Sequence, residues 1–411
     1  MICWITKDLG TAAYAAVSEA AGFSVLDVRD LVDRSGNRLA DVRAKIDEGL
    51  AWLRAGEKVV VCCDLGMSRS NAVAAGILSA AEGISVDDAI RRVLSASGNA
   101  AMRIDVLAVV REALGRHPAP SLNPPPGVRL LVTGASGFLG SHVVRAFGEE
   151  VKVLAPTRDQ VDLERDAVRL DLAVKENGIN TVLHLASPRI YTTTQALGAS
   201  LVMLKNVLDV CRQNAAVLVY VSSWEVYSGY KAAELQADES LAPRPGGTYG
   251  LAKVLCENMI EHYHKERGLA RTLLRSSPVY GVGSDRPRFL WNFLHQALRD
   301  EEIVTHAYRN GLPSLDLLHV DDLTRALLEA VRRRPQVSVN VGSGVGTSTA
   351  EVARLIVERL GSRSLIRQVA LDASVGNIVM DTRLAGKALG WRAEIGLREG
   401  LESVIQAAAG E

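Results

Sequence analysis

The sequence has few of the features that mark secreted or membrane-spanning proteins. It contains five cysteines, an odd number that does not suit a disulfide framework and fits a reducing compartment. No apolar run approaches the roughly eighteen residues that a membrane-spanning helix needs, and the start of the chain lacks a basic stretch followed by an apolar core. We therefore expect a cytoplasmic protein without a membrane span.

The chain also lacks an excess of charge of one sign. Its 47 Lys and Arg residues balance 47 Asp and Glu residues, so the formal net charge is zero. Neither nucleic acid nor an acidic membrane surface is expected as a partner, because both attract strongly basic proteins. The 411 residues, 48% of them apolar, are enough to fill the cores of two domains.

A strand, a glycine turn and a helix start follow one another in the run Val128–His142. Val128–Val132 is apolar without helical spacing, which predicts a strand buried on both faces. Gly134 permits a tight turn, Gly137 lets the backbone approach a pyrophosphate, and Gly140 lets the helix pack close to the strand. The spacing predicts a dinucleotide site with the phosphates at the helix N-terminus.

A second group of polar residues fits redox chemistry. Tyr249 stands four residues before Lys253, which puts both side chains on one face of a helix. A cation at this distance is expected to lower the pKa of the phenol, so Tyr249 can give or take a carbonyl proton while hydride moves to or from a nicotinamide. Ser223, at the end of a buried run, can hydrogen-bond the same oxygen.

Eight motifs in order make residues 127 to about 405 resemble an extended short-chain dehydrogenase/reductase of the NAD-dependent epimerase/dehydratase family. They are TGASGFLG, VLHLAS, SSWEVY, the Tyr249/Lys253 pair, RSSPVYG, LLHVDDLTRA, NVGSG and DTRLAGKALGW. The resemblance implies a doubly wound parallel sheet of the Rossmann type with a small C-terminal part over the substrate. It also implies that Tyr249, Lys253 and Ser223 are catalytic and that Lys253 holds the nicotinamide ribose. The implied coenzyme-binding residues are Gly134, Ser136, Gly137, Phe138, Leu139, Gly140, Arg158, Asp162, Leu163, Leu185, Ala186, Ser187, Tyr249, Lys253, Pro278 and Val279.

The preference between NAD and NADP depends on the end of the second strand. An acid there binds a ribose 2′-hydroxyl, whereas an arginine accommodates a 2′-phosphate. Arg158 stands at this place, in a run that also resembles the NADP-dependent GDP-fucose synthases. The neighbouring Asp159 leaves a surface pair as the alternative. We expect NADP, with NAD as the second choice.

The N-terminal quarter has a different motif. Residues 1 to 115 alternate short apolar strands with alanine-rich helical stretches, among them a strand at Phe23–Val28 and a helix at Leu39–Gly56. A buried strand then feeds a loop from Cys63 to Arg69. This spacing lets loop N–H groups surround a phosphate above one thiol, while Arg69 takes two phosphate oxygens.

This stretch resembles the cysteine-dependent dual-specificity phosphatases. The resemblance implies that Cys63 attacks phosphorus as a thiolate, Arg69 holds the phosphoryl group and Ser70 helps to release the thiolate. The acid that protonates the leaving oxygen is Asp33 or Asp30, with Asp33 preferred. The family usually has His before the cysteine, and Cys62 stands there instead. A degenerate domain that binds phosphate or only packs is therefore the alternative.

The substrate-binding end departs from the usual nucleotide-sugar pattern. Trp224 stands where sugar dehydratases carry an acid, which disfavours dehydration, although Glu225 can still serve as a base. Leu315 replaces an arginine that usually clamps the diphosphate. Other arginines can replace that clamp or lie on the surface: Arg189, Arg286, Arg288 and Arg309.

Together these motifs predict a bifunctional α/β enzyme. A small phosphatase-like α/β domain (1–115) and a Pro-rich linker (116–127) precede the dinucleotide-binding domain (128–411). The expected substrates are a sugar, cyclitol or nucleoside phosphate, or a nucleotide sugar, with phosphate removed from a related metabolite. The alternative is a nucleotide-sugar epimerase or reductase with a catalytically dead phosphatase-like module. No metal is expected. The family resemblance implies a homodimer formed through two helices; the stretch Leu251–Tyr263 is apolar enough to serve, and the alternative is that this face belongs to the core.

Overall fold

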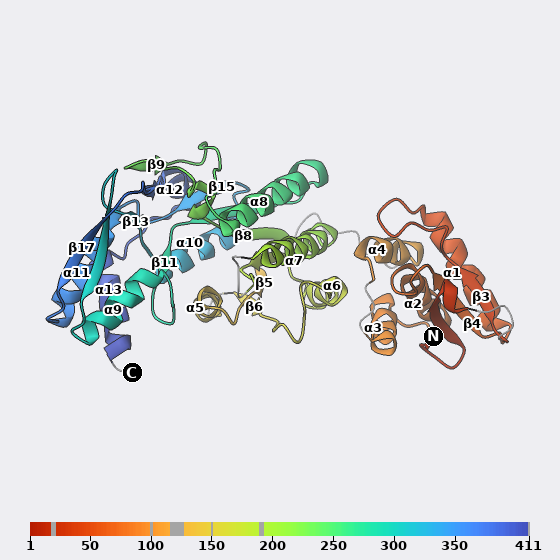
Figure 1. Cartoon of the computed structure of the whole chain (residues 1–411). Helices are drawn as coiled ribbons and strands as arrows, with labels where there is room; N and C mark the ends of the chain where they lie inside the picture. The colour runs from red at the N-terminus through yellow and green to blue at the C-terminus, as the bar shows by residue number, and fades with distance from the viewer. Residues whose placement is uncertain (18–21, 99–101, 116–126, 149–150, 189–192, 410–411) are drawn as a thin grey trace. The chain divides into compact units, whose positions relative to one another are not determined.

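The described residues of the computed structural model form two compact units. Figure 1 labels many of their helices and strands. The description covers residues 1–17, 22–98, 102–115, 127–148, 151–188 and 193–409. The N-terminal unit comprises Met1–Pro124, Arg158–Asn177 and Gln213–Ala215. The C-terminal unit comprises Pro125–Thr157, Gly178–Arg212 and Ala216–Glu411. The division thus differs from the predicted domains, because residues 158–177 group with the N-terminal unit.

The N-terminal unit is built on a four-stranded sheet. The strand order is β1 (Cys3–Trp4), β2 (Leu9–Ala13), β4 (Val59–Cys63) and β3 (Ser24–Asp27). β2 and β3 pair in parallel with β4, whose five residues are all buried. The predicted strand and first helix are confirmed by β3 and α1. The helices are α1 (Leu39–Arg54), α2 (Arg69–Glu82), α3 (Val86–Ser97), α4 (Ile104–Ala113) and α6 (Ala167–Glu176).

Helix α6 belongs to the core of the N-terminal unit. Val168 and Leu172 are 2% and 5% exposed and lie in the same apolar cluster as the residues of β4 and α2. Apolar burial of this extent stabilises a fold by about 1.5–3 kcal/mol per large side chain. Residues from the middle of the chain therefore complete the core of its first quarter.

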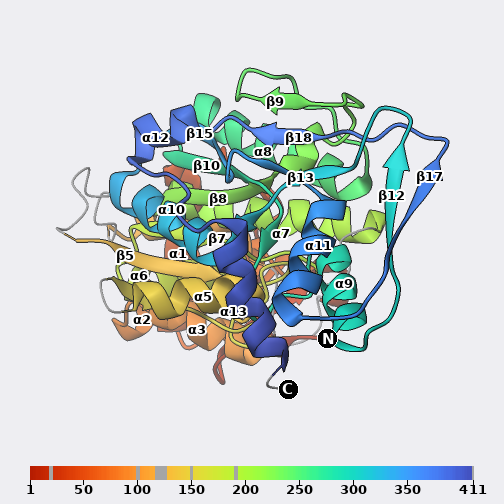
Figure 2. The ribbon, with the colours of Figure 1, turned by 90° about the vertical axis from the view of Figure 1, so that its left-hand side faces the viewer.

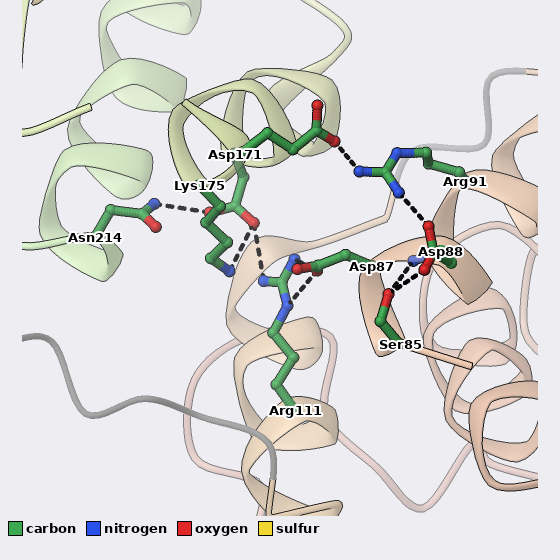
Figure 3. Close-up of polar contacts among 9 residues, drawn as sticks. Ser85, Asp87, Asp88, Arg91, Arg111, Asp171, Lys175 and Asn214 are labelled. Atoms are coloured by element: carbon green, nitrogen blue, oxygen red, sulfur yellow. Dashed lines mark hydrogen bonds and ion pairs between the residues drawn. The ribbon is translucent and has the colours of Figure 1, made fainter. Parts of the chain in front are cut away.

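A buried group of charges joins α4 and α6 (Figure 3). The carboxylate of Asp171 is fully buried and lies 2.8 Å from Arg111 Nη1 and 3.0 Å from Lys175 Nζ. Asn214 donates a 2.8 Å hydrogen bond to it, and Asp87 lies 2.7 Å from the other side of Arg111. Burial raises the pKa of Asp171, but the charges of Arg111 and Lys175 lower it by more, so the net shift of the pKa is downward. The carboxyl is therefore ionised near neutral pH.

The C-terminal unit contains a six-stranded parallel sheet, of which the strands β5, β7, β8, β10 and β15 are labelled in Figure 2. Its strand order confirms the predicted Rossmann-type doubly wound sheet. β6 lies on one side of β5 and β7 on the other, so the direction in which strands are added reverses at β5. Ligands of such sheets bind at the carboxyl ends of the strands near this point. The strand order is β15 (Ser338–Val341), β10 (Arg271–Ser276), β8 (Val217–Ser223), β7 (Thr181–His184), β5 (Arg129–Thr133) and β6 (Lys152–Leu154).

The helices of this sheet are α5 (Phe138–Phe147), α7 (Thr194–Gln213), α8 (Thr248–Arg267), α10 (Val320–Arg333) and α12 (Arg383–Leu389). The smaller part has its own apolar cluster around α9 (Arg288–Leu298), α11 (Thr349–Leu360) and α13 (Leu397–Ala409). Its longest strands, β12 (Ile303–Tyr308) and β17 (Ile366–Leu371), pair in parallel. Short strands complete it: β9 (Leu235–Ala237), β11 (Val279–Tyr280), β13 (Ser314–Asp316), β14 (Leu318–His319), β16 (Gly346–Ser348) and β18 (Ile378–Met380).

Candidate active sites

The glycine turn joins β5 to α5 as predicted. Gly134 has a φ of +73°, and a Cβ there would lie 2.7 Å from the backbone nitrogen of Ala186. A Cβ at Gly140 would lie 2.2 Å from the carbonyl oxygen of Gly134, so the helix start needs glycine for close packing. Gly137 is the N-cap of α5 and has open space on one side, since a Cβ would meet only one atom, 3.3 Å away. These features fit a dinucleotide phosphate at the first turn of α5.

A cleft of about 660 Å³ lies within the C-terminal unit. It brings together Ser223 from the end of β8 and Tyr249 from the first turn of α8. Predicted coenzyme residues from three segments also line it: Phe138, Leu139, Ser187, Pro278 and Val279. Ser136 lies in the exposed part of the glycine turn, and Leu185 and Ala186 follow β7 beside Gly134.

Tyr249 and Lys253 share one face of α8, as their spacing predicts. Lys253 Nζ lies 5.5 Å from the centre of the Tyr249 ring. The ammonium donates a 2.8 Å hydrogen bond to the carbonyl oxygen of Val221 and a 3.3 Å bond to the hydroxyl of Tyr220. These bonds tether the start of α8 to β8, the strand that ends in Ser223.

The pKa of Tyr249 differs from the sequence prediction. Burial raises it above the usual value for tyrosine, and the negative charges of Glu225 and Cys256 raise it further. The prediction that Lys253 lowers this pKa toward neutrality is wrong for the structure described. The ammonium is held by Val221, and burial lowers the pKa of Lys253 itself. Tyr249 is therefore a protonated phenol here, suited to donate a proton.

A buried ion pair behind the cleft was missed by the sequence analysis. Arg275 Nη2 lies 2.7 Å from a carboxylate oxygen of Glu257, and both side chains are at most 10% exposed. Ser222 donates a 2.5 Å hydrogen bond to Glu257, and Arg275 donates one of 2.5 Å to Tyr227. The pair fixes α8 against β8 and β10. Arg275, which follows the apolar pair Leu273 and Leu274 in a strand, was the available signal.

His184 was also missed, although it lies within a quoted motif. Its Nδ1 is 2.7 Å from the hydroxyl of Thr133 in β5, and its ring stacks on Tyr220. Burial, followed by the charge of Lys253, lowers the pKa of His184 to about 3. The imidazole is neutral at all ordinary pH values and links β7 to the neighbouring strands β5 and β8.

The substrate end of the cleft contains arginines. Arg286 and Arg288 line it together with Leu315, so two of the four arginines that were considered as replacement clamps lie at the cleft. Arg309 instead pairs with Asp372, and Arg189 lies outside the described residues.

Trp224 and Glu225 also line the cleft. Burial raises the pKa of Glu225, opposed by Lys253. A carboxyl with a raised pKa can exchange a proton nearer neutral pH than an exposed glutamate.

Three predicted coenzyme residues belong to the N-terminal unit, in the segment Arg158–Asn177. Arg158 is 76% exposed and lies 3.3 Å from Glu164 and 3.9 Å from Asp162. Contact of Arg158, Asp162 and Leu163 with the coenzyme stays a prediction.

The loop after β4 in the N-terminal unit folds around a thiol. Cys63 Sγ lies 3.3 Å from the hydroxyl of Ser70 at the start of α2. Burial raises the pKa of Cys63, but hydrogen bonds from the side chain and backbone of Ser70 and from the backbone of Met67 and Gly66 outweigh it, so the net shift is downward. Gly66 has a φ of +69°, and a Cβ there would lie 2.3 Å from the backbone nitrogen of Ala13.

Cys62 differs from Cys63 despite being its neighbour. Its side chain lies on the opposite face of β4 and is fully buried. Burial, then the charge of Asp27, raises its pKa to about 11. Of the two neighbouring thiols, only that of Cys63 has a lowered pKa.

Arg69 begins α2 with a partly engaged guanidinium. Its Nη1 donates hydrogen bonds to the carbonyl oxygens of Arg29 (3.1 Å) and Leu31 (2.8 Å). Its Nη2 is paired with the carboxylate of Asp64, a residue of the same loop. Its buried Nε has no hydrogen-bond partner among the described residues. A buried donor of this kind is costly unless a ligand completes it.

The two candidate acids lie in different surroundings. The hydroxyl of Ser68, within the loop, donates a 2.5 Å hydrogen bond to Asp33. Asp30 instead lies 3.1 Å from Lys45 Nζ and is 61% exposed. The structure thus brings Asp33, the preferred acid, to the loop of Cys63 and Arg69.

The C-terminal unit, with its Rossmann-type sheet and its Ser223/Tyr249/Lys253 group, defines an extended short-chain dehydrogenase/reductase. The chain belongs to the NAD dependent epimerase/dehydratase family, whose sequence model matches residues 130–342, just over half of the chain. No helix of the described part of the chain is long and apolar enough to cross a membrane.

Individual relatives agree with this assignment. The chain is 28% identical over 275 residues to dTDP-4-dehydro-6-deoxy-D-allose reductase of Streptomyces bikiniensis, covering 59% of this chain and 84% of the relative. The solved structure of MoeE5 in complex with UDP-glucuronic acid and NAD is 27% identical, with a TM-score of 0.57 over 69% of this chain and 99% of that one. The structure of RMD from Pseudomonas aeruginosa complexed with NADPH shares the fold, with a TM-score of 0.60 at 22% identity, over 68% and 98%.

Proposed function

We propose that the C-terminal unit is an NAD(P)-dependent reductase or epimerase for a sugar-type substrate. The observation that carries this proposal is the cleft that unites Ser223, Tyr249 and the glycine-turn helix. When bound, the nicotinamide supplies or accepts the hydride. Tyr249 donates a proton to the carbonyl oxygen during reduction and takes it back during oxidation, while Ser223 orients that oxygen. Arg158 favours NADP, with NAD as the alternative.

A nucleotide sugar is the substrate class that the relatives favour. MoeE5 binds UDP-glucuronic acid, and the Streptomyces relative is named for a dTDP-sugar. Leu315 at the usual arginine position leaves a sugar, cyclitol or nucleoside phosphate as the second candidate. Trp224 beside Ser223 cannot donate a proton to a leaving hydroxyl, which argues against dehydration.

The test is to incubate the chain with nucleotide sugars and with phosphorylated sugars, cyclitols and nucleosides, and to record nicotinamide absorbance with NADP or NAD. An epimerase regenerates its coenzyme, so the sugar products are also separated by chromatography. The proposal predicts turnover of at least one compound and its loss in Tyr249→Phe. Turnover that survives this substitution would contradict the role of the phenol.

We propose further that the N-terminal unit is a cysteine-dependent phosphatase. Its support is the lowered pKa of Cys63, the adjacent Ser70 hydroxyl and the unpartnered Nε of Arg69. The Cys63 thiolate attacks phosphorus, the bond from phosphorus to the leaving oxygen breaks, and protonated Asp33 gives that oxygen its proton. Water, giving a proton to Asp33, then displaces the thiolate from phosphorus and yields inorganic phosphate.

Phosphate release from an aryl phosphate tests this second activity. Cys63→Ser should abolish release, Asp33→Asn should reduce it, and Asp30→Asn should leave it near the wild-type rate. Equal release from wild type and Cys63→Ser would refute the nucleophile. If the wild type binds phosphate but releases none from any ester, the alternative of a dead phosphate-binding module replaces the phosphatase.

Two active units on one chain suggest consecutive steps on one metabolite. Tethering raises the effective concentration of a shared intermediate. Recording nicotinamide absorbance and free phosphate in one tube tests this, and the idea fails if no compound gives both signals.

A homodimer remains a separate proposal. Of the apolar residues in the stretch 251–263, Cys256, Ile260 and Tyr263 are buried within the chain, while Leu251 is 43% exposed. Light scattering of the purified chain would decide it.

A further inference from the structure

The loop that holds Cys63 also holds a carboxylate, which the proposed phosphatase chemistry does not use. Asp64 follows the nucleophile directly and is 62% exposed. An acidic residue at this place is unfavourable for anion binding, because it adds negative charge beside a site meant for a phosphate dianion. Its position therefore calls for a role.

The contacts of Arg69 suggest that role. A guanidinium binds phosphate in the bidentate mode through two parallel N–H groups on one edge of its fork. The Nη1 of Arg69 is committed to the backbone oxygens of Arg29 and Leu31, which fixes the direction of the fork. The remaining edge consists of Nε, which lacks a partner among the described residues, and Nη2, which Asp64 occupies.

We infer that Asp64 is a built-in competitor of phosphate for Arg69; this inference rests on the proposed phosphate loop. Its carboxylate takes one of the two donors that a phosphate dianion requires. Binding of a phosphomonoester must displace it, and its return to Nη2 helps to expel the inorganic phosphate that remains after hydrolysis. Asp64 thus determines how weakly the loop holds its product, and it also disfavours ligands that carry more than one anionic group near the phosphate.

The test measures phosphate binding rather than turnover. In the full-length chain, inorganic phosphate should protect Cys63 from alkylation by iodoacetamide, and the concentration that halves the rate gives an apparent dissociation constant. Asp64→Ala should lower this constant by at least about fivefold, because a paired, partly exposed carboxylate and its repulsion of the dianion are both removed. The constant of Asp64→Asn should lie between those of the wild type and Asp64→Ala, since its amide oxygen still accepts a hydrogen bond from Nη2 but carries no charge.

Asp47→Asn is the matched control. Asp47 is a half-exposed carboxylate of the same unit, paired with Arg43 on α1, so its removal changes the net charge equally. It should leave the phosphate constant unchanged. Cys62 serves as the internal control for the fold, since it is fully buried and must stay unreactive in every variant.

The outcomes separate this inference from the proposed phosphatase. Protection of Cys63 at lower phosphate concentrations in Asp64→Ala than in the wild type, or protection in that variant alone, supports the role of Asp64 as a competitor. Unchanged or weaker protection, when the wild type is protected, overturns it and leaves the phosphate loop standing. Absence of protection in the wild type and in every variant overturns both the inference and the anion site.

Discussion

The buried carboxylate of Asp171 gives the most direct test of how the N-terminal unit is held together. The substitution Asp171→Asn removes a charge that is fully buried and lies within 3.0 Å of two cations. Arg111 is 4% exposed and Lys175 is 20% exposed, so neither can recover its pairing from water without movement. Loss of one partner from such a pair costs about 3–5 kcal/mol of the free energy of unfolding, mostly because the other charge stays buried.

The measurement must report on each unit separately. Pulsed alkylation in urea, with the labelled peptides quantified by mass spectrometry, does so because Cys62 lies in β4 of the N-terminal unit and Cys211 in α7 of the C-terminal unit. Both thiols are fully buried. Asp171→Asn should lower the free energy of unfolding measured at Cys62 by about 3–5 kcal/mol. A smaller shift at Cys211 is expected, since that residue belongs to the other unit.

Glu176→Gln is the matched control on the same helix. Glu176 pairs with Arg91, but both side chains are more than 40% exposed. An exposed pair contributes about 0–1 kcal/mol, so this variant should remain close to wild type. If Asp171→Asn also stays within about 1 kcal/mol at Cys62, the buried charge group does not stabilise the unit and this reasoning is refuted.

Three further predictions concern the sites. Tyr249→Phe should lower kcat at least about 100-fold with little change in coenzyme affinity, as measured by steady-state kinetics and coenzyme titration, because only the proton donor is lost. At pH 7 Cys63 should be alkylated far faster than Cys62, whose pKa is about 11, and Ser70→Ala should slow the reaction of Cys63 by removing a hydrogen bond to the thiolate. The folded-state pKa of His184, about 3, lies below its usual value. Its contribution to the free energy of unfolding is therefore fully present above about pH 6.5 and falls by up to about 1.4 kcal/mol per pH unit below that. Urea unfolding at pH 6.5 and 5.5, followed at Cys211, should show this loss in the wild type and less of it in His184→Gln.

Much of the C-terminal site was predictable because its determinants are local. The turn of Gly134, Gly137 and Gly140 depends on backbone space, and the Tyr249/Lys253 spacing depends on one helix. The pKa of Tyr249 was not predictable in the same way. It depends on burial and on Glu225 and Cys256, which the fold brings together from η2 (Trp224–Tyr227) and from the third turn of α8.

The pairing of charges between distant segments was likewise hidden from the sequence. Arg275 and Glu257 are ordinary residues until a strand and a helix bring them within 2.7 Å. A partner within one loop was hidden as well, since the spacing of Cys63 and Arg69 indicates a phosphate loop but does not show that Asp64 occupies the guanidinium edge of Arg69. A sequence pattern specifies which groups are present, whereas their protonation and partners depend on long-range packing.

The place of α6 is the strongest case of long-range packing. A break at the proline-rich linker would separate residues 1–115 from Val168, Leu172 and Asp171, which complete the apolar cluster and the buried charge group of the N-terminal unit. The isolated segment would expose apolar surface and leave Arg111 with Asp87 as its remaining acidic partner. We expect a fragment ending at residue 115 to be less stable than the same unit in the whole chain. Hydrogen exchange of β4, compared between fragment and full chain, measures this difference, and equal protection would show that the first quarter folds without α6.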